Sequence, residues 1–318
     1  MLAPVMITTY SRLNHLQRTI EALQKNELAE ETTVYVYLDG PKPGDEEKVE
    51  AVRKYLTTVT GFAAFHVVER QQNIGAHENA KQANYEVLDK HGSMIRMEDD
   101  IVTAPGFLRF MNLALAKYKD DHNVFSISGY CIPIKIPKNY QYDAFFLQKF
   151  EGWGCGLWRD RLDDAYHQIT PEEFKKFASN KKLSRAFLRG GRKDMLVMLE
   201  AVANGKLEAA DVVIWYIQFL KNQYTLFPTQ SLVKNIGMDG SGFHCGVTDF
   251  FDVSLSGKTS FHLPDQLIIN QRIIKSHRKF WNDYCDQNKP GIFASGIFRR
   301  VINIPIRVLR RLRRIITD

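Results

Sequence analysis

"IRMEDDIVTAPGF", residues 95–107, joins an apolar, strand-like run to three consecutive acids and then to a proline. Adjacent like charges repel one another, so an ordinary loop gains little from having Glu98, Asp99 and Asp100 side by side. A bound Mg²⁺ or Mn²⁺ would offset this repulsion, because these cations prefer carboxylate and phosphate oxygens. The alternative is a solvated acidic turn, which the position of the triplet at the end of a strand disfavours.

Outward from this stretch, the first 130 residues alternate strand-like and helix-like segments. Ser11 is expected to cap the first helix, and Pro105 suits the first turn of another. Strands are expected over 4–10, 33–40, 63–69, 93–97 and 123–130, and helices over 46–58, over 76–90, after Pro105, and after Ser11 with a stripe of Leu13, Leu16, Ile20 and Leu23. The alternation predicts an α/β fold with a mostly parallel sheet flanked by helices. Since such sheets bind ligands at the carboxyl ends of their strands, Asp39 and the acid triplet should line one crevice.

The second half is less regular. It contains "FEGWGCGLW" (150–158), a helical middle, the apolar run "DVVIWYIQFL" (211–220) and the glycine-rich loop "NIGMDGSGFHCG" (235–246). We therefore expect residues 1–130 and 131–290 to form two halves of one domain, followed by a tail over 291–318.

Composition narrows the class of protein. The chain has 318 residues, of which 44% are apolar and 25% charged, as in soluble globular proteins. Its cysteines form no Cys-x-x-Cys pair, so a structural zinc site is not expected and a reduced, cytosolic setting is the simpler interpretation. The N-terminal apolar run fits a first strand better than a signal peptide, and no run reaches the roughly 18 apolar residues of a membrane span.

The positive charge is concentrated in the tail. Seven arginines and one acid lie from Arg299 to Asp318, so this segment carries +6 of the net +7 and the body is almost neutral. This distribution argues against a general nucleic-acid-binding surface. Pro305 interrupts the tail, so a helix should begin near Ile306.

That helix would be amphipathic. It places Val308, Leu309, Leu312, Ile315 and Ile316 on one face and Arg307, Arg310, Arg311, Arg313 and Arg314 on the other. We expect residues 297–318 to hold the protein on an anionic membrane surface, the cytoplasmic face of the cell membrane. The alternatives are a helix docked on the body of the protein and an RNA-binding arm.

Several segments together resemble the GT-A-type glycosyltransferases. They are "PVMITTYSR" (4–12), "LDG" (38–40), "QQNIGAHENAKQA" (71–83), "MEDDIVTAPGF" (97–107), "EGWGCGLW" (151–158) and "SLVKNIGMDGSGFHCG" (231–246). The chain is most similar to the inverting N-acetylglucosaminyltransferases with a Glu-Asp-Asp metal motif, and to bacterial relatives that build surface polysaccharides. The resemblance covers roughly residues 4–250 and implies a GT-A-type, Rossmann-like fold.

The resemblance also implies roles. Asp100 would bind Mn²⁺ or Mg²⁺, and His244 would touch the metal or the diphosphate. Asp39 would contact uracil. Trp153 and Gly154 would face the acceptor. Asp211 would be the catalytic base, with Glu151 in reserve. The remaining nucleotide-sugar contacts would be Thr8, Arg12, Asn73, Gly75, Lys81, Glu98 and Asp99.

Each role has a plainer alternative. Arg12 can be a surface residue of a first helical turn, residues 73–81 a helix-entry turn, and Asp211 a helix N-cap. Trp153 can fill the core, as is favoured for Trp158, and a lone histidine such as His244 more often binds neither metal nor diphosphate. In the resembled family a tryptophan usually lies nearer the base aspartate than Trp215 lies to Asp211, which leaves the register open.

The resemblance implies transfer of a sugar from a UDP-sugar to a hydroxyl of a glycan or lipid-linked acceptor, with inversion, in bacterial surface polysaccharide synthesis. A sugar-nucleotidyltransferase is a rival, although it would want a glycine-rich loop after the first strand, where "TTYSRLNHL" (8–16) has no glycine. A non-catalytic membrane-surface scaffold is another, which the intact acids disfavour.

Overall fold

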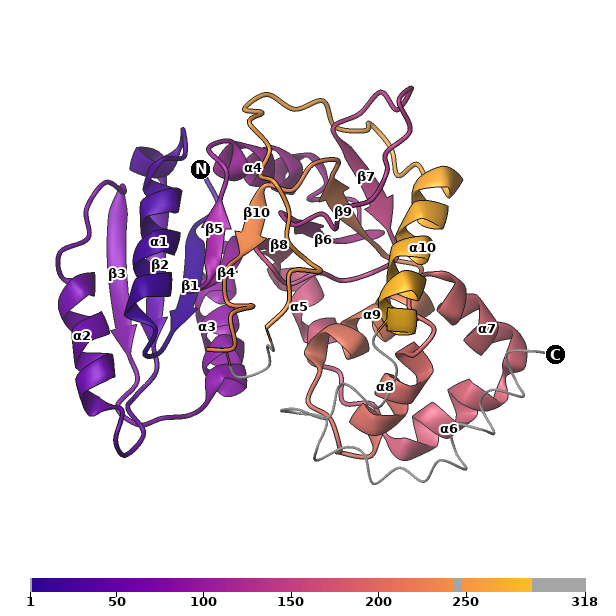
Figure 1. The fold of residues 1–318 in the computed structure, drawn as a ribbon, viewed down its shortest axis with the longest axis horizontal. Helices are drawn as coiled ribbons and strands as arrows, with labels where there is room; N and C mark the ends of the chain where they lie inside the picture. The colour runs from indigo at the N-terminus through magenta and orange to yellow at the C-terminus, as the bar shows by residue number, and fades with distance from the viewer. Residues whose placement is uncertain (1, 243–246, 288–318) are drawn as a thin grey trace.

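The computed structural model of the chain describes residues 2–242 and 247–287. Within them, one eight-stranded sheet forms the centre of the molecule (Figure 1). Its strands follow the order β3 (Ala64–Glu69), β2 (Thr33–Leu38), β1 (Val5–Thr9), β4 (Ser93–Glu98), β8 (Cys155–Trp158), β6 (Val124–Ser128), β9 (Tyr224–Pro228) and β7 (Ala144–Leu147). A small second sheet pairs β5 (Ile101–Thr103) with β10 (Val233–Asn235).

The strand directions place the candidate site. β3, β2, β1 and β4 run parallel to one another, as do β6 and β9, whereas β8 and β7 run antiparallel to their neighbours. The expected α/β class is confirmed, and the sheet is mixed rather than wholly parallel. In the β1 register Thr8 lies opposite both Tyr37 and Glu98, so the carboxyl ends of β2, β1 and β4 meet at one edge.

Helices cover both faces of the sheet because the strands alternate their side chains. On β1, Val5 and Ile7 pack with α1, α2 and α4, whereas Met6 packs on the opposite face with α3, α5 and one residue of α9. The bounds are α1 (Leu13–Gln24), α2 (Glu46–Leu56), α3 (Ala76–His91), α4 (Phe107–Lys117), α5 (Arg159–Ala165) and α9 (Ala210–Leu220). A 3₁₀ turn, η1, spans Ala29–Glu31.

A separate helical layer lies on the opposite side of the molecule from β3 and α2 (Figure 1). It consists of α6 (Pro171–Ser179), α7 (Lys181–Arg189) and α8 (Met195–Ala203), packed against α9. Its core is aromatic: the ring centroids of Phe177 and Tyr216 are 4.9 Å apart. α10 (Gln271–Gln287) follows and packs through Ile273 against β7 and β9.

Three sequence expectations need correction at helix ends. Ser11 does not cap α1, which begins at Leu13 with Arg12 at the N-cap position and no side-chain cap. Asp211 is not an N-cap either, since Ala209 holds that position in α9. Pro105 precedes α4 rather than lying in its first turn, because α4 begins at Phe107 after Gly106. Of the predicted stripe, Leu16, Ile20 and Leu23 are buried, whereas Leu13 is only partly buried against the same core.

The tail predicted over residues 291–318 and His244 lie outside the described residues. In the described part of the chain, no helix is both long and apolar enough to cross a membrane.

Candidate active site

The acid triplet lies at the carboxyl end of β4, where Arg12 reaches it from the end of β1. The Arg12 Nη2 atom forms an ion pair with Asp99 Oδ1 and lies 2.8 Å from Asp100 Oδ2. Thr9 Oγ1 donates to Asp99 Oδ2 at 3.0 Å. Asp99 and Asp100 are only 4% and 5% exposed, so these ion pairs form largely out of water. Arg12 is therefore a bridge between strands, and not a surface residue of a helical turn.

Arginines within the chain offset the repulsion among the three acids. Besides Arg12, Arg96 contributes, because its Nη2 atom lies 2.8 Å from Glu98 Oε1. A bound cation is therefore not the only charge that compensates the triplet. The role of Arg96 is marked in the sequence only as a charged residue inside the otherwise apolar stretch "SMIRM" (93–97).

The electrostatics of the bridge follow from its burial. Burial raises the pKa of Asp99 to about 6, although Arg12 opposes the rise, and the neighbouring charge of Asp100 adds to it. Burial by itself would lower the pKa of Arg12, but Asp99 and Asp100 raise it overall. The guanidinium therefore stays charged.

Two polar atoms of this bridge are buried without a hydrogen-bond partner in the described residues: Asp100 Oδ1 and Arg12 Nη1. Leaving such an atom unpaired costs about 1–3 kcal/mol. One is an acceptor and the other a donor, so a ligand that brings both a cation and anionic oxygens would satisfy both.

A divalent cation fits this arrangement only with help from a substrate. Across residues 2–242 and 247–287, no group of three or more His, Cys, Asp or Glu residues is placed to hold a metal ion. Mg²⁺ is commonly bound by one or two carboxylates together with substrate phosphates, and the unpaired Asp100 oxygen suits that mode. His244, the other predicted ligand, lies outside the described residues.

Asp39, Asn73 and Gly75 come together beside β1. The Asp39 carboxylate accepts hydrogen bonds from the backbone N–H groups of Gly40, Ile74 and Gly75 at 2.9–3.0 Å, and from Asn73 Nδ2 at 3.1 Å. Its own backbone N–H donates to Thr9 O, which links this turn to the Asp99 bridge. In the structure Asp39 thus fixes the turn that enters α3, and its contact with uracil remains a prediction.

Lys81 lies in another environment. Its ammonium group sits 5.6 Å from the centre of the Tyr166 ring, and no ion pair joins it to the acid triplet in the described part of the chain. The predicted diphosphate contact of Lys81 is therefore the least supported of the donor-side predictions.

The segment after β10 lies over the bridge. Ile236 N donates to Asp100 O at 2.9 Å, and Asp239 Oδ2 lies 3.1 Å from His15 Nε2. The packing at Gly237 is tight enough that a Cβ there would come within 2.2 Å of Asp100 Oδ2. The beginning of the glycine-rich loop thus contacts both Asp100 and α1.

The predicted acceptor segment lies near Arg96, the ion-pair partner of Glu98. A Cβ on Gly152 would lie 3.3 Å from Arg96 Nη1, and Cys155 pairs with Arg96 across β4 and β8. Gly154 has a φ of +61°, which favours glycine, and packs tightly against Val233 and Phe107. The half-buried Trp153 packs edge-on against Tyr130 with ring centroids 4.7 Å apart. Trp158, in contrast, is a core residue, only 3% exposed.

The two candidate bases lie beside different cations. Glu151 Oε2 is 2.9 Å from Lys149 Nζ. Asp211 is exposed in the first turn of α9. The hydrogen bond and charge of Asp194 raise the pKa of Arg192 against the effect of burial, and the charge of Asp211 adds a smaller contribution. Within residues 2–242 and 247–287, no ion pair or hydrogen bond joins Asp211 to the acid triplet.

Trp281 of α10 contacts both Lys149, the partner of Glu151, and Arg192, the cation near Asp211. The Lys149 ammonium lies 4.7 Å from the centre of its ring and the Arg192 guanidinium 4.9 Å. Both distances suit cation–π contact. Sequence reasoning missed all three residues, because nothing in the sequence shows that residues 149, 192 and 281 converge.

No family model and no curated protein matches the chain. Among solved structures, the chain is similar to glycosyltransferases. TarS from S. aureus is 14% identical, with a TM-score of 0.43, and the match covers 81% of this chain and 41% of TarS. TarS 1–349, solved with UDP-GlcNAc, is 12% identical with a TM-score of 0.40, over 73% of this chain and 58% of that one. The mannosyltransferase PcManGT from Pyrobaculum calidifontis, solved with GDP-Man and Mn²⁺, is 12% identical with a TM-score of 0.40, over 69% and 68% of the two chains. This chain thus spans less than half the length of TarS. We therefore derive the chemistry of its site from its own side chains.

Proposed function

We propose that this chain is a metal-dependent glycosyltransferase that moves a sugar from a UDP-sugar to a hydroxyl of a glycan or lipid-linked acceptor, with inversion. One observation carries the proposal: the unpaired acceptor Asp100 Oδ1 and the unpaired donor Arg12 Nη1 lie buried on the same ion pair. They occur at the carboxyl ends of neighbouring parallel strands, where sheets of this class bind ligands. A nucleotide diphosphate with a divalent cation satisfies both atoms at once.

The donor would lie along the edge formed by β2, β1 and β4. Asp100 would hold Mn²⁺ or Mg²⁺, and Arg12 would donate to a diphosphate oxygen. When bound, the cation offsets the negative charge that develops on the departing diphosphate. Thr8, Asp39, Asn73 and Gly75 would contact the nucleoside side, with Glu98 and Asp99 nearer the sugar.

The acceptor would enter beside residues 151–154. An attack on the anomeric carbon from the side opposite the diphosphate inverts its configuration and needs a base to take the hydroxyl proton. Asp211 and Glu151 are the candidates. Glu151 adjoins the segment that contacts Arg96, whereas Asp211 is the more exposed carboxylate.

The place of the reaction belongs to the same proposal. A lipid-linked acceptor would lie at a membrane surface, and the arginine-rich pattern of residues 297–318 suits the cytoplasmic face of a cell membrane. Synthesis of a bacterial surface polysaccharide is the process that these features fit.

A thermal-shift screen with and without Mn²⁺ tests the proposal. A ligand of the folded state at 100 times its Kd stabilises the protein by about 2.7 kcal/mol, so binding should raise the melting temperature visibly. We expect UDP-sugars to do so only with the metal, and UDP to be released on incubation. ADP- and GDP-sugars serve as matched controls. Absence of any metal-dependent shift with UDP-sugars, together with no UDP release, contradicts the proposal.

A further inference from the structure

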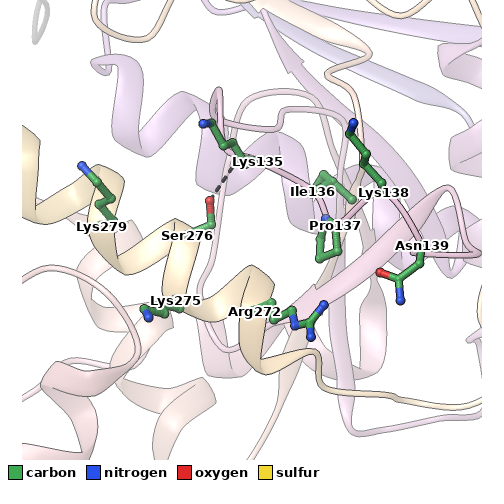
Figure 2. A pocket seen from close by; sticks show the side chains of 9 residues that line it. All are labelled: Lys135, Ile136, Pro137, Lys138, Asn139, Arg272, Lys275, Ser276 and Lys279. Carbon is green, nitrogen blue, oxygen red and sulfur yellow. Dashed lines mark hydrogen bonds between the residues drawn. The ribbon is translucent and has the colours of Figure 1, made fainter.

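A hollow of about 620 Å³ lies between residues 135–139 and the first half of α10 (Figure 2). Its lining includes five cationic side chains and no carboxylate: Lys135, Lys138, Arg272, Lys275 and Lys279. The segment 135–139 follows β6 and leads to β7, at the edge of the sheet farthest from β3. The strands β8, β6 and β9 separate that edge from β4 and the acid triplet, so the hollow is distinct from the candidate active site.

The positive charge of this hollow is largely uncompensated. Lys279 forms an ion pair with Asp283 at 2.5 Å, but the other four cations form none within residues 2–242 and 247–287. On α10, Arg272, Lys275 and Lys279 are spaced so that they lie on one face of the helix. Like charges gathered in this way repel one another, and an anion bound among them removes that cost.

The walls of the hollow are held in place. The backbone N–H of Lys135 donates to Ser276 Oγ at 3.1 Å, which ties the segment to α10 (Figure 2). Ile136 and Ile274 pack on a shared core that includes Ile273. Asn270 Oδ1 accepts from the backbone N–H groups of Arg272 and Ile273 at 3.0 and 3.2 Å, so α10 begins at a fixed point.

The polar lining favours phosphate oxygens. Arginine can bind a phosphate through two parallel hydrogen bonds, and lysine supplies a mobile point charge. Ser276, whose oxygen accepts from Lys135, keeps its hydroxyl proton to donate, and Asn139 offers amide donors. A second hollow, of about 320 Å³, does not favour anions in the same way, because the carboxylate of Glu21 lines it together with Arg18 and Lys25.

We propose that the hollow between residues 135–139 and α10 is a binding site for the phosphate group of an anionic ligand. The ligand is either the headgroup of an anionic lipid or a soluble phosphate ester. This site does not depend on the proposed sugar transfer, and donor binding at Asp100 reports separately on that activity.

The double variant Arg272→Glu/Lys275→Glu tests the proposal in the full chain. Arg272 lies in the first turn of α10, where glutamate suits the helix dipole, and Lys275 lies in the second turn. Both side chains are exposed, so the variant should fold. Arg272→Gln/Lys275→Gln should give an intermediate effect. Arg18→Glu/Lys25→Glu is the control, because it changes the net charge equally at the mixed hollow.

Two probes identify the source of the phosphate. Titration with glycerol 3-phosphate measures binding of a soluble ester, and sedimentation with phosphatidylcholine vesicles, with and without phosphatidylglycerol, measures binding of a headgroup. We expect the Glu/Glu variant to weaken binding by about tenfold or more relative to the control, because it replaces two cations that would contact the phosphate with anions. A loss with both probes supports the site and a soluble ester as ligand. A loss with vesicles alone supports the site and a lipid headgroup. Equal binding by the Glu/Glu variant and the control with both probes, or no binding by the wild type, overturns the proposal.

Discussion

At the scale of single residues, Arg12 controls the candidate site. Its single positive charge offsets part of the negative charge of Asp99 and Asp100 in a largely buried ion pair, while its Nη1 atom has no partner in the described residues. A lone divalent cation approaching Asp100 would be repelled by Arg12. A diphosphate that arrives with the cation brings negative charge to Arg12 and removes this repulsion. Metal and nucleotide should therefore bind together more tightly than either does alone.

The first prediction concerns Asp100. Asp100→Ala should abolish transfer and remove the Mn²⁺-dependent part of UDP binding, because it deletes the unpaired acceptor. The fold should survive, since Arg12 keeps Asp99 as a partner. UDP titrations with and without Mn²⁺ measure the effect. Asp265→Ala is the matched control, since it removes an exposed carboxylate paired with Lys117. Unchanged metal-dependent UDP affinity in Asp100→Ala would falsify the assignment.

The second prediction separates the two candidate bases. Asp211→Asn should lower kcat by roughly a hundredfold or more, the usual scale for losing general-base assistance, with donor binding intact. The pH dependence of kcat should lose the limb that reports the base. Glu151→Gln is the paired variant, and its amide can still accept a hydrogen bond from Lys149. If Glu151→Gln abolishes activity while Asp211→Asn stays near wild type, the roles must be exchanged.

The sequence predicts which residues form the candidate site only where those residues directly follow a recognisable strand. The triplet 98–100 and the turn at Asp39 lie directly after recognisable strands, so their common edge was predictable. Arg96 pairs with Glu98 on its own strand, but it lies opposite Cys155 only because β4 pairs with β8. Lys149, Arg192 and Trp281 meet through tertiary packing, for which no local sequence pattern exists.

At the scale of elements, the loop after β10 couples two sheets to the site. β10 pairs with β5, which follows the acid triplet directly, so the segment 235–239 is placed over Asp100 and against α1. Helices and strands of the first half follow the sequence closely because hydrophobic periodicity reports local burial. The antiparallel β8 between β4 and β6 was not predictable, since strand order in the second half is set by long-range pairing.

The third prediction tests this coupling. Gly237→Ala should displace the loop, because the new Cβ would lie 2.2 Å from Asp100 Oδ2 and 3.0 Å from Arg12 Nη1. Weaker metal-dependent UDP binding should follow, with little change in global stability. Gly257→Ala is the matched control, since no atom lies within 4 Å of the Cβ it would add. Equal UDP affinity in the two variants would show that the loop position does not matter for the donor.

At the scale of the whole molecule, one sheet unites the two halves that the sequence distinguishes. β8, from the second half, lies between β4 and β6 of the first, and a single core runs from Ala3 to Trp281. The candidate donor side and acceptor side therefore share one sheet and one core. The positive charge, in contrast, is concentrated towards the end of the chain, in the cationic hollow on α10 and in the arginine-rich segment that follows α10 in the sequence.

The fourth prediction concerns that segment. Deleting residues 297–318 should leave an enzyme that still releases UDP from its donor but sediments much more weakly with anionic liposomes, and any remaining binding would be due to the cationic hollow on α10. Each arginine near such a surface contributes on the order of 1 kcal/mol, and the aliphatic face adds to it. Leu309→Glu/Leu312→Glu keeps the arginines and removes the apolar face. An interfacial helix should then lose liposome binding, whereas an arm that binds RNA through its arginines should keep RNA binding. If the deleted and full-length proteins sediment equally, or if the deletion unfolds the protein, the segment acts as part of the body instead.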